Sequence, residues 1–253
     1  MGGVSRARWR PWVATGLLAL LTVACGVPPD QQSDAGRSAG ETRAADEQEN
    51  RPATEKDLGL IRASERGDTQ AVRRLLQQDA SVDARDERGR TPLIAAAYAN
   101  RLEVARLLIG AGAGVNVKDE TQQSTYLIST SEVGDDPRLL EIALRNGANV
   151  HSLDSYNGTS LIRAAERGHV RIVERLLQTS VEVNHVNNLE WTALLEAIIL
   201  GDGGPRHTEV VRLLVSAGAD VSLADGEGVT PLEHARQQGY QEMVRILRAA
   251  GAR

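Results

Sequence analysis

The chain has 253 residues, of which 41% are hydrophobic but only 3% aromatic, and it contains no phenylalanine. Small aliphatic side chains must therefore fill the interior, which favours thin packed layers over one thick core. The formal net charge of −5 argues against a nucleic-acid-binding protein, because such proteins carry a cationic excess that neutralises phosphates. A single cysteine excludes an intramolecular disulfide framework and a multi-cysteine zinc site.

The first 24 residues have the composition of a secretory signal peptide. Three arginines lie in the first ten residues, no acidic residue occurs, and an apolar run of about twelve residues extends from Val13 to Ala24. That length is short for a transmembrane helix and typical of the hydrophobic part of a signal peptide. We therefore predict a signal peptide of the lipoprotein type over residues 1–24.

The end of this segment, Thr22-Val23-Ala24-Cys25, resembles a bacterial lipobox, although Thr22 stands where leucine is usual. The resemblance implies that Cys25 is acylated and becomes the mature N-terminus. The alternatives are an ordinary cleaved signal, or a short uncleaved anchor with an incidental cysteine. We expect a lipid anchor at Cys25 that attaches the protein to a membrane outside the cytoplasm, in the cell envelope or periplasm.

Residues 25–55 are predicted to be the acylated cysteine followed by a disordered linker. From Val27 to Glu55 the sequence contains no leucine, isoleucine or aromatic residue, and proline, glycine, serine, glutamine and charged residues dominate. Such a segment buries too little apolar surface to offset the entropy lost on ordering. A flexible chain of this length spans roughly 30 Å, so it would hold the folded part away from a membrane surface.

A pattern with a period of 33 residues fills the rest of the chain. The sequence Asp-Glu-Arg-Gly-Arg-Thr-Pro-Leu at residues 86–93 recurs as Asp-Gly-Glu-Gly-Val-Thr-Pro-Leu at 225–232. Related segments lie at 154–161 and 187–194, with a weaker copy at 125–127. Three units close with Gly-Ala-x-Val, at residues 112–115, 147–150 and 218–221.

These motifs closely resemble the ankyrin repeat, in about six units over residues 56–253. The resemblance implies an all-α repeat solenoid, in which each unit has two helices and a β-hairpin-type loop. The physical chemistry agrees, because threonine caps a helix well and proline is tolerated in its first turn. Gly112 is placed to end the second helix in a left-handed conformation. One unit cannot bury its faces alone, so the units must stack.

Several units depart from the repeat pattern. The first unit lacks Thr-Pro-Leu and is predicted to be the N-terminal cap, whereas the sixth ends at Gly251-Ala252 and is predicted to be the C-terminal cap. The third unit is 35 residues long. The fifth is 38 residues long and contains an insertion from Asp202 to Arg206. We expect this insertion to be a solvated connector, with His207 exposed beside it.

No catalytic or ligand-binding motif is present in the sequence. There is no Gly-x-Ser-x-Gly, no glycine-rich phosphate loop and no His-Glu-x-x-His. The five histidines fall at different places in their repeats, and His169 is expected to pack or to cap a helix. We predict no catalysis, no metal and no cofactor. The weakest alternative is an enzyme with its catalytic groups at residues 202–209.

The resemblance implies that a partner protein docks on the concave side, formed by hairpin tips and inner-helix positions. The candidate residues are Arg88, Arg90, Tyr98, Tyr156, Arg167, Leu189, Trp191, Ile199 and Leu200. Trp191 is expected to be exposed near Leu189 and Tyr156, because its place directly before the helix-start Thr192 is awkward for a core residue. Such a group resembles a binding hot spot, in which tryptophan, tyrosine and arginine dominate. The alternative is that Trp191 folds over the enlarged fifth repeat and covers its insertion.

We therefore predict a monomeric, non-catalytic protein-binding module that a lipid anchor holds at a membrane. Its partners would be another protein and the membrane, and not a nucleic acid. The alternative function is an accessory stabiliser, or an immunity-type inhibitor, of a secreted or envelope enzyme. It would use the same concave side.

Overall fold

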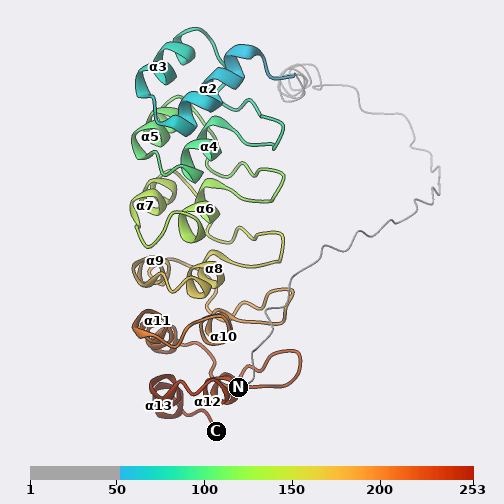
Figure 1. The fold of residues 1–253 in the computed structure, drawn as a ribbon, viewed down its shortest axis with the longest axis vertical. Coiled ribbons are helices and arrows are strands. Elements are labelled where there is room, and N and C mark those ends of the chain that lie inside the picture. The colour runs from blue at the N-terminus through green and yellow to red at the C-terminus, as the bar shows by residue number, and fades with distance from the viewer. Residues whose placement is uncertain (1–51) are drawn as a thin grey trace, which may run out of the picture. The chain divides into compact units, whose positions relative to one another are not determined.

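In the computed structural model, the described residues are 52–253, and they form twelve α-helices arranged as six pairs (Figure 1). We call the first helix of each pair the inner helix. The six inner helices are α2 (Glu55–Arg66), α4 (Pro92–Tyr98), α6 (Thr125–Ser131), α8 (Ser160–Glu166), α10 (Ala193–Ile199) and α12 (Pro231–Gln237). We call the second helix of each pair the outer helix. The six outer helices are α3 (Thr69–Gln77), α5 (Leu102–Gly110), α7 (Arg138–Arg145), α9 (Val170–Leu176), α11 (Pro205–Ser216) and α13 (Gln241–Ala249). Inner helices stack on inner helices, with the hairpin loops on the side away from the outer helices (Figure 1).

The predicted all-α solenoid of six repeats is thereby confirmed. The first helix begins at Glu55, next to the start expected for the repeat domain. The predicted signal peptide, Cys25 and most of the predicted linker lie outside the described residues. Between residues 52 and 253, no helix is both long and apolar enough to cross a membrane.

Four inner helices begin at the threonine caps that the sequence predicts, whereas α6 is capped by Ser124, one residue before the predicted Thr125. In five repeats the hydroxyl of the capping residue accepts a hydrogen bond from the backbone N–H three residues ahead. These capping residues are Thr91, Ser124, Thr159, Thr192 and Thr230. The first repeat uses a capping box in which Thr54 and Asp57 bond each other's backbone N–H groups. Each cap satisfies amide groups that the first helical turn leaves without a partner.

The outer helices end as predicted. Gly112, which follows α5, has a φ of +98°, in the left-handed region that glycine enters at little cost. Ala113 then donates its backbone N–H to the carbonyl of Leu108, which closes the helix end. The same turn closes α7, α11 and α13 at Gly147, Gly218 and Gly251.

The five hairpin loops share one local structure. In each, a side-chain oxygen of the first residue accepts the backbone N–H groups two and four residues ahead. These first residues are Asp86, Asp119, Asp154, Asn187 and Asp225. The residue three positions ahead has a positive φ, as at Gly89 (68°) and Glu190 (61°). Because this turn recurs, the tip residues occupy equivalent positions in successive repeats.

The core consists of thin layers of small side chains, as the composition predicts. Buried leucine, isoleucine, valine and alanine residues form two clusters along the stack, and Tyr126 is the largest fully buried side chain. The Tyr126 hydroxyl lies 2.6 Å from the Ser160 hydroxyl of the next repeat. Burial raises the pKa of Tyr126 to about 12, so its phenol stays protonated at neutral pH.

The insertion in the fifth repeat differs from the prediction of a solvated connector. Pro205 and Arg206 belong to the first turn of α11, which has 12 residues and has proline at its start. The Tyr240 hydroxyl donates to the carbonyl of Gly201 over 2.9 Å, and the Tyr240 ring packs against Gly203. The expectation that His207 is exposed was wrong, since only 13% of its side chain is accessible.

Candidate protein-binding surface

Large exposed apolar side chains gather on two neighbouring hairpins. Among the described residues, four large hydrophobic side chains are exposed, namely Tyr156 (53%), Leu200 (51%), Val186 (42%) and Leu189 (36%). Three of the four belong to the hairpins of the fourth and fifth repeats. These hairpins touch directly, because the backbone N–H of Asn188 donates to the carbonyl of Tyr156 over 2.9 Å. We call Tyr156, Val186 and Leu189 the tip cluster.

Trp191 does not extend the tip cluster as predicted. Its side chain is half-buried, so the expectation of an exposed tryptophan was wrong. Its backbone N–H and carbonyl both bond Asn187, which closes the fifth hairpin. The tryptophan directly precedes the capping residue Thr192 of α10.

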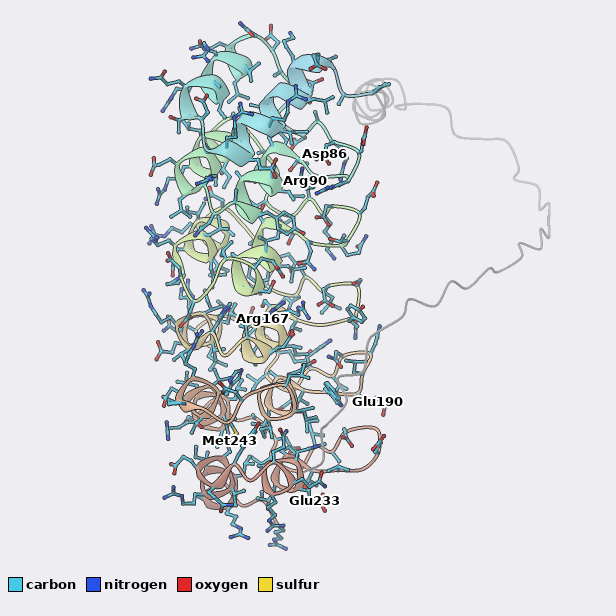
Figure 2. All side chains as sticks on the ribbon, in the orientation of Figure 1. Asp86, Arg90, Arg167, Glu190, Glu233 and Met243 are labelled. Atoms are coloured by element: carbon cyan, nitrogen blue, oxygen red, sulfur yellow. The ribbon has the colours of Figure 1, made fainter. Side chains whose placement is uncertain are left out.

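Arg167, Ile199 and Leu200 lie at the ends of inner helices in the same two repeats. Arg167 and Leu200 are the capping residues that end α8 and α10, so they occupy equivalent positions on neighbouring helices. Leu200 is exposed and Ile199 is half-buried. Arg167, labelled in Figure 2, lies 3.9 Å from the carboxylate of Glu132 and remains 43% exposed. Five of the nine predicted residues, besides Trp191, thus lie in the fourth and fifth repeats.

The other three candidates lie two repeats away, in the second repeat. Arg88 is exposed at its hairpin tip. Arg90 is largely buried and binds the carboxylates of Asp86 at 2.9 Å and Glu65 at 3.2 Å. The Tyr98 hydroxyl donates to Asp119 over 3.0 Å. Arg90 and Tyr98 therefore already join the second repeat to its neighbours.

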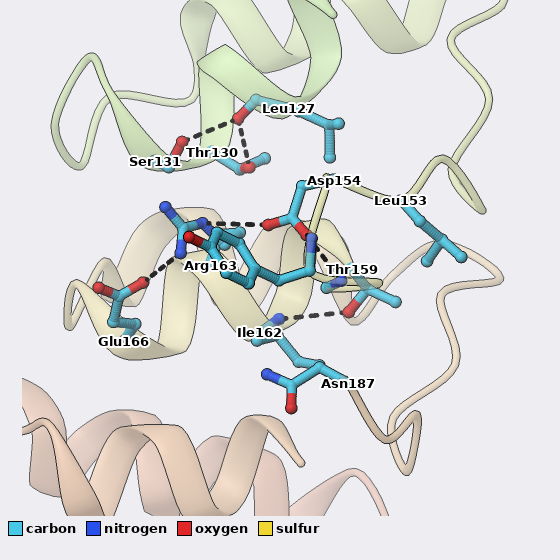
Figure 3. A network of polar contacts seen from close by, with 12 residues as sticks. Leu127, Thr130, Ser131, Leu153, Asp154, Thr159, Ile162, Arg163, Glu166 and Asn187 are labelled. Carbon is cyan, nitrogen blue, oxygen red and sulfur yellow. Dashed lines mark hydrogen bonds and ion pairs between the residues drawn. The ribbon is translucent and has the colours of Figure 1, made fainter. Parts of the chain in front are cut away.

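A network of charged groups lies beneath the fourth hairpin (Figure 3). Arg163 on α8 lies 3.5 Å from the carboxylate of Asp154, which begins the hairpin, and 2.9 Å from that of Glu166, one turn along the helix. Asp154 is buried, and its other oxygen holds the hairpin backbone. The arginine thus fixes the fourth hairpin to α8.

The fifth repeat replaces this pair with Asn187 and Glu196. Glu196 occupies the position on α10 that Arg163 has on α8, and it is only 4% exposed. Its Oε1 accepts the Asn187 amide over 2.9 Å, whereas its Oε2 has no hydrogen-bond partner among the described residues. Burial, together with the nearby Glu166 carboxylate, raises the pKa of Glu196 to about 7. This carboxyl therefore titrates near neutral pH, directly beneath the hairpin that carries Leu189.

The histidines are engaged within the chain. His207 Nδ1 lies 2.8 Å from Asp202 and Nε2 lies 3.1 Å from the carbonyl of Glu166, so both ring nitrogens contact polar groups of the chain. His169 is buried and bonds the carbonyl of Thr130, in agreement with the predicted packing role. Within residues 52–253, no three histidine, cysteine or acidic side chains are placed to hold a metal ion.

Two features of the site were missed from the sequence. Val186 belongs to the tip cluster, and its place directly before the first hairpin residue, where Arg85 and Lys118 stand in other repeats, was a usable signal. The buried carboxyl of Glu196 could not be found in the same way, because it depends on contacts with the preceding repeat.

Known proteins share this architecture and much of the sequence. The family model described as Ankyrin repeats (3 copies) matches residues 20–119 and 127–225. The ankyrin repeat protein YahD of Escherichia coli (strain K12) is 38% identical over 75% of this chain and 94% of its own length. The crystal structure of an ankyrin repeat domain from Acinetobacter baumannii AYE has a TM-score of 0.72 and 47% identity, covering 77% of this chain and 98% of that one.

A second similar structure comes from a complex. It is that of the predatory endopeptidase Bd0816 of Bdellovibrio bacteriovorus with the immunity protein Bd3460, and the matched chain has a TM-score of 0.67 and 25% identity. The match covers 78% of this chain and 98% of that chain. Together with the six stacked repeats, these similarities establish that the chain belongs to the ankyrin-repeat family, whose repeats are protein-binding modules.

Proposed function

We propose that the chain binds another protein, without catalysis and as a monomer, through the tip cluster and the neighbouring end of α10. The observation that carries this proposal is the concentration of exposed apolar side chains, three of four, on two hairpins in direct contact. Exposed apolar groups on a rigid support are typical of binding hot spots. The bonds that fix each hairpin mean that little ordering is required when the partner docks.

We place the repeats outside the cytoplasmic membrane, held by an acyl group on Cys25. The support is the apolar segment that ends in a lipobox-like sequence at the sole cysteine of the chain. Mass spectrometry of the mature N-terminus tests this part alone, and the expected species begins at Cys25 and carries lipid. A mature chain with unmodified Cys25, or one cleaved at another position, would contradict it.

Affinity capture from a membrane-envelope fraction tests the binding surface. The full chain is compared with the double variant Tyr156→Ser/Leu189→Ser and with a matched control, Glu87→Ser/Glu227→Ser, changed at the exposed tips of two other hairpins. We expect one protein to be captured by the wild type and the control, and to be depleted at least about tenfold with the tip-cluster variant. Equal capture by all three chains would refute the assigned surface.

A second candidate function is an immunity-type inhibitor of a secreted or envelope enzyme. The specific observation in its favour is the likeness to a chain from the Bd0816–Bd3460 complex of an endopeptidase with an immunity protein. If the captured protein is a hydrolase, adding the purified chain should lower its activity in proportion to the amount of complex formed. Unchanged activity at saturation would favour a stabilising or recruiting role instead.

A further inference from the structure

The outer helices differ in charge from the rest of the described chain. Eleven arginines and five glutamates lie within α3, α5, α7, α9, α11 and α13, an excess of six positive charges. The remaining described residues carry 12 lysines and arginines against 23 acidic side chains. The modest formal net charge of −5 for the whole chain therefore conceals a strong separation of positive from negative charge.

The positive excess lies on one side of the stack. The outer helices lie along one side of the stack and the hairpin loops along the other (Figure 1). Ten of the eleven outer-helix arginines are exposed, and only Arg175 is half-buried. Side chains tipped with nitrogen project from this side in Figure 2. We call the exposed surface of the six outer helices the outer-helix face.

Glutamates neutralise only part of the outer-helix face. Arg106 is paired with Glu103 on the same helix. Arg212 of α11 is likewise paired with Glu209, and Arg245 of α13 with Glu242. Glu141 is shared by two guanidinium groups, at 2.5 Å from Arg175 and 3.8 Å from Arg145. Within the described part of the chain, five further outer-helix arginines form no ion pair: Arg73, Arg74, Arg171, Arg206 and Arg248.

We propose that the outer-helix face docks on a membrane surface that carries anionic phospholipid headgroups. Guanidinium groups bind phosphate oxygens in a bidentate manner, and basic segments are attracted to anionic leaflets. The arginines are spread over all six outer helices, and of the eleven only Arg106, Arg138 and Arg145 line a common pocket, between α5 and α7. An extended anionic surface matches this distribution. The hairpin loops lie on the opposite side of the stack (Figure 1), so docking through the outer-helix face leaves the tip cluster facing away from the membrane and accessible to a protein.

A nucleic acid fits the outer-helix face less well. Reading a groove needs a helix or ribbon that protrudes into it, whereas these six helices pack side by side. Five glutamates also interrupt the arginines, and their repulsion would weaken contact with a closely spaced phosphate backbone. A fluid lipid surface tolerates them because its headgroups are free to redistribute around them.

Vesicle flotation tests the proposal with the full chain carrying Cys25→Ser, which has no acylation site. Binding is measured on phosphatidylcholine vesicles with and without about 30% phosphatidylglycerol. We expect the partition coefficient to be roughly tenfold or more higher on the anionic vesicles at low salt, and this gain to vanish at about 0.5 M salt. Residues 1–51 are common to all variants, so what they contribute cancels in the comparison.

Two variants with the same change in net charge locate the binding face. The first replaces five outer-helix arginines by glutamine: Arg73, Arg74, Arg145, Arg171 and Arg248. The matched control replaces five exposed arginines elsewhere: Arg62, Arg66, Arg88, Arg167 and Arg236. The partition coefficient of the first variant on anionic vesicles should be roughly tenfold lower than that of the wild type. That of the control variant should be lower by about twofold or less.

Three results would overturn the proposal: equal losses in the two variants, equal binding to neutral and anionic vesicles, or tighter binding of a DNA duplex to the same face. Circular dichroism checks that both variants fold. If the variant with five outer-helix substitutions does not fold, the double variant Arg73→Gln/Arg74→Gln, at two exposed positions without ion pairs, gives the same comparison with a smaller expected loss of vesicle binding. The matched control is then a double variant, Arg62→Gln/Arg66→Gln.

Discussion

The wild type should become less stable as the pH rises, and replacing Glu196 by glutamine should abolish this decrease. The carboxyl group is almost fully buried, and burial together with Glu166 raises its pKa from 4.5 to about 7. Between these two values the unfolded chain has already released the proton that the folded chain still holds. Stability therefore falls as the pH rises through this window and does not change further above it.

The difference between 4.5 and about 7 corresponds to about 3 kcal/mol in the free energy of unfolding. Glutamine is nearly isosteric with the protonated acid, and its carbonyl oxygen keeps the bond from the Asn187 amide. At pH 4.5 the variant and the wild type should be about equally stable. At pH 8 the variant should be more stable by about 3 kcal/mol.

Urea denaturation followed by circular dichroism, at several pH values between 4.5 and 8, measures this difference directly. Glu233→Gln is the matched control, because the hydrogen bonds from Thr230 lower the pKa of that exposed carboxyl. The Glu233→Gln substitution should have the opposite effect on stability to that of Glu196→Gln. Above about pH 4.5 the Glu233→Gln variant should be less stable than the wild type. A stability difference between Glu196→Gln and the wild type that does not change with pH would refute the reasoning.

Three further substitutions test the repeat architecture. Thr192→Ala removes the cap of α10 and should cost about 1 kcal/mol in urea denaturation, whereas Thr192→Ser should cost much less. Gly203→Ala should lower the melting temperature more than Gly218→Ala, because both glycines have a positive φ but only the Gly203 methyl group would run into the Tyr240 ring; equal losses would contradict this. Glu190→Gly should stabilise the chain by roughly 0.5–1 kcal/mol, since Glu190 has a φ of 61°. A loss of stability would show that the Glu190 side chain stabilises the fold by more than its left-handed backbone destabilises it.

The fold could be predicted because its signals are local. A threonine before a proline, or a glycine after Leu-Leu, determines where a helix begins or ends through bonds made within a few residues. These signals recur every 33 residues, so each copy supports the others. The insertion of the fifth repeat has no second copy, and its packing against Tyr240, about forty residues away, could not be read from its composition.

The candidate site could be predicted only in part, for a related reason. The hairpin turn determines that Tyr156 and Leu189 stand at tips, and both are exposed. Arg90 and Tyr98 stand at equally plausible positions, but their polar groups bind Glu65 and Asp119 in neighbouring repeats, about 20 to 25 residues away. Position in the repeat thus predicts which side a residue faces, and the neighbouring repeats decide whether it is free.

Site-specific photocrosslinking tests the central claim most directly. A photoreactive amino acid is placed at Leu189 in the tip cluster and, as a control, at the exposed Gln77 on the outer helix α3. In cells, the Leu189 position should give one discrete protein adduct that disappears when Tyr156 is changed to serine, and the Gln77 position should not give that adduct. The same adducts at both positions, or a protein adduct at Gln77 alone, would contradict binding through the hairpins of the fourth and fifth repeats.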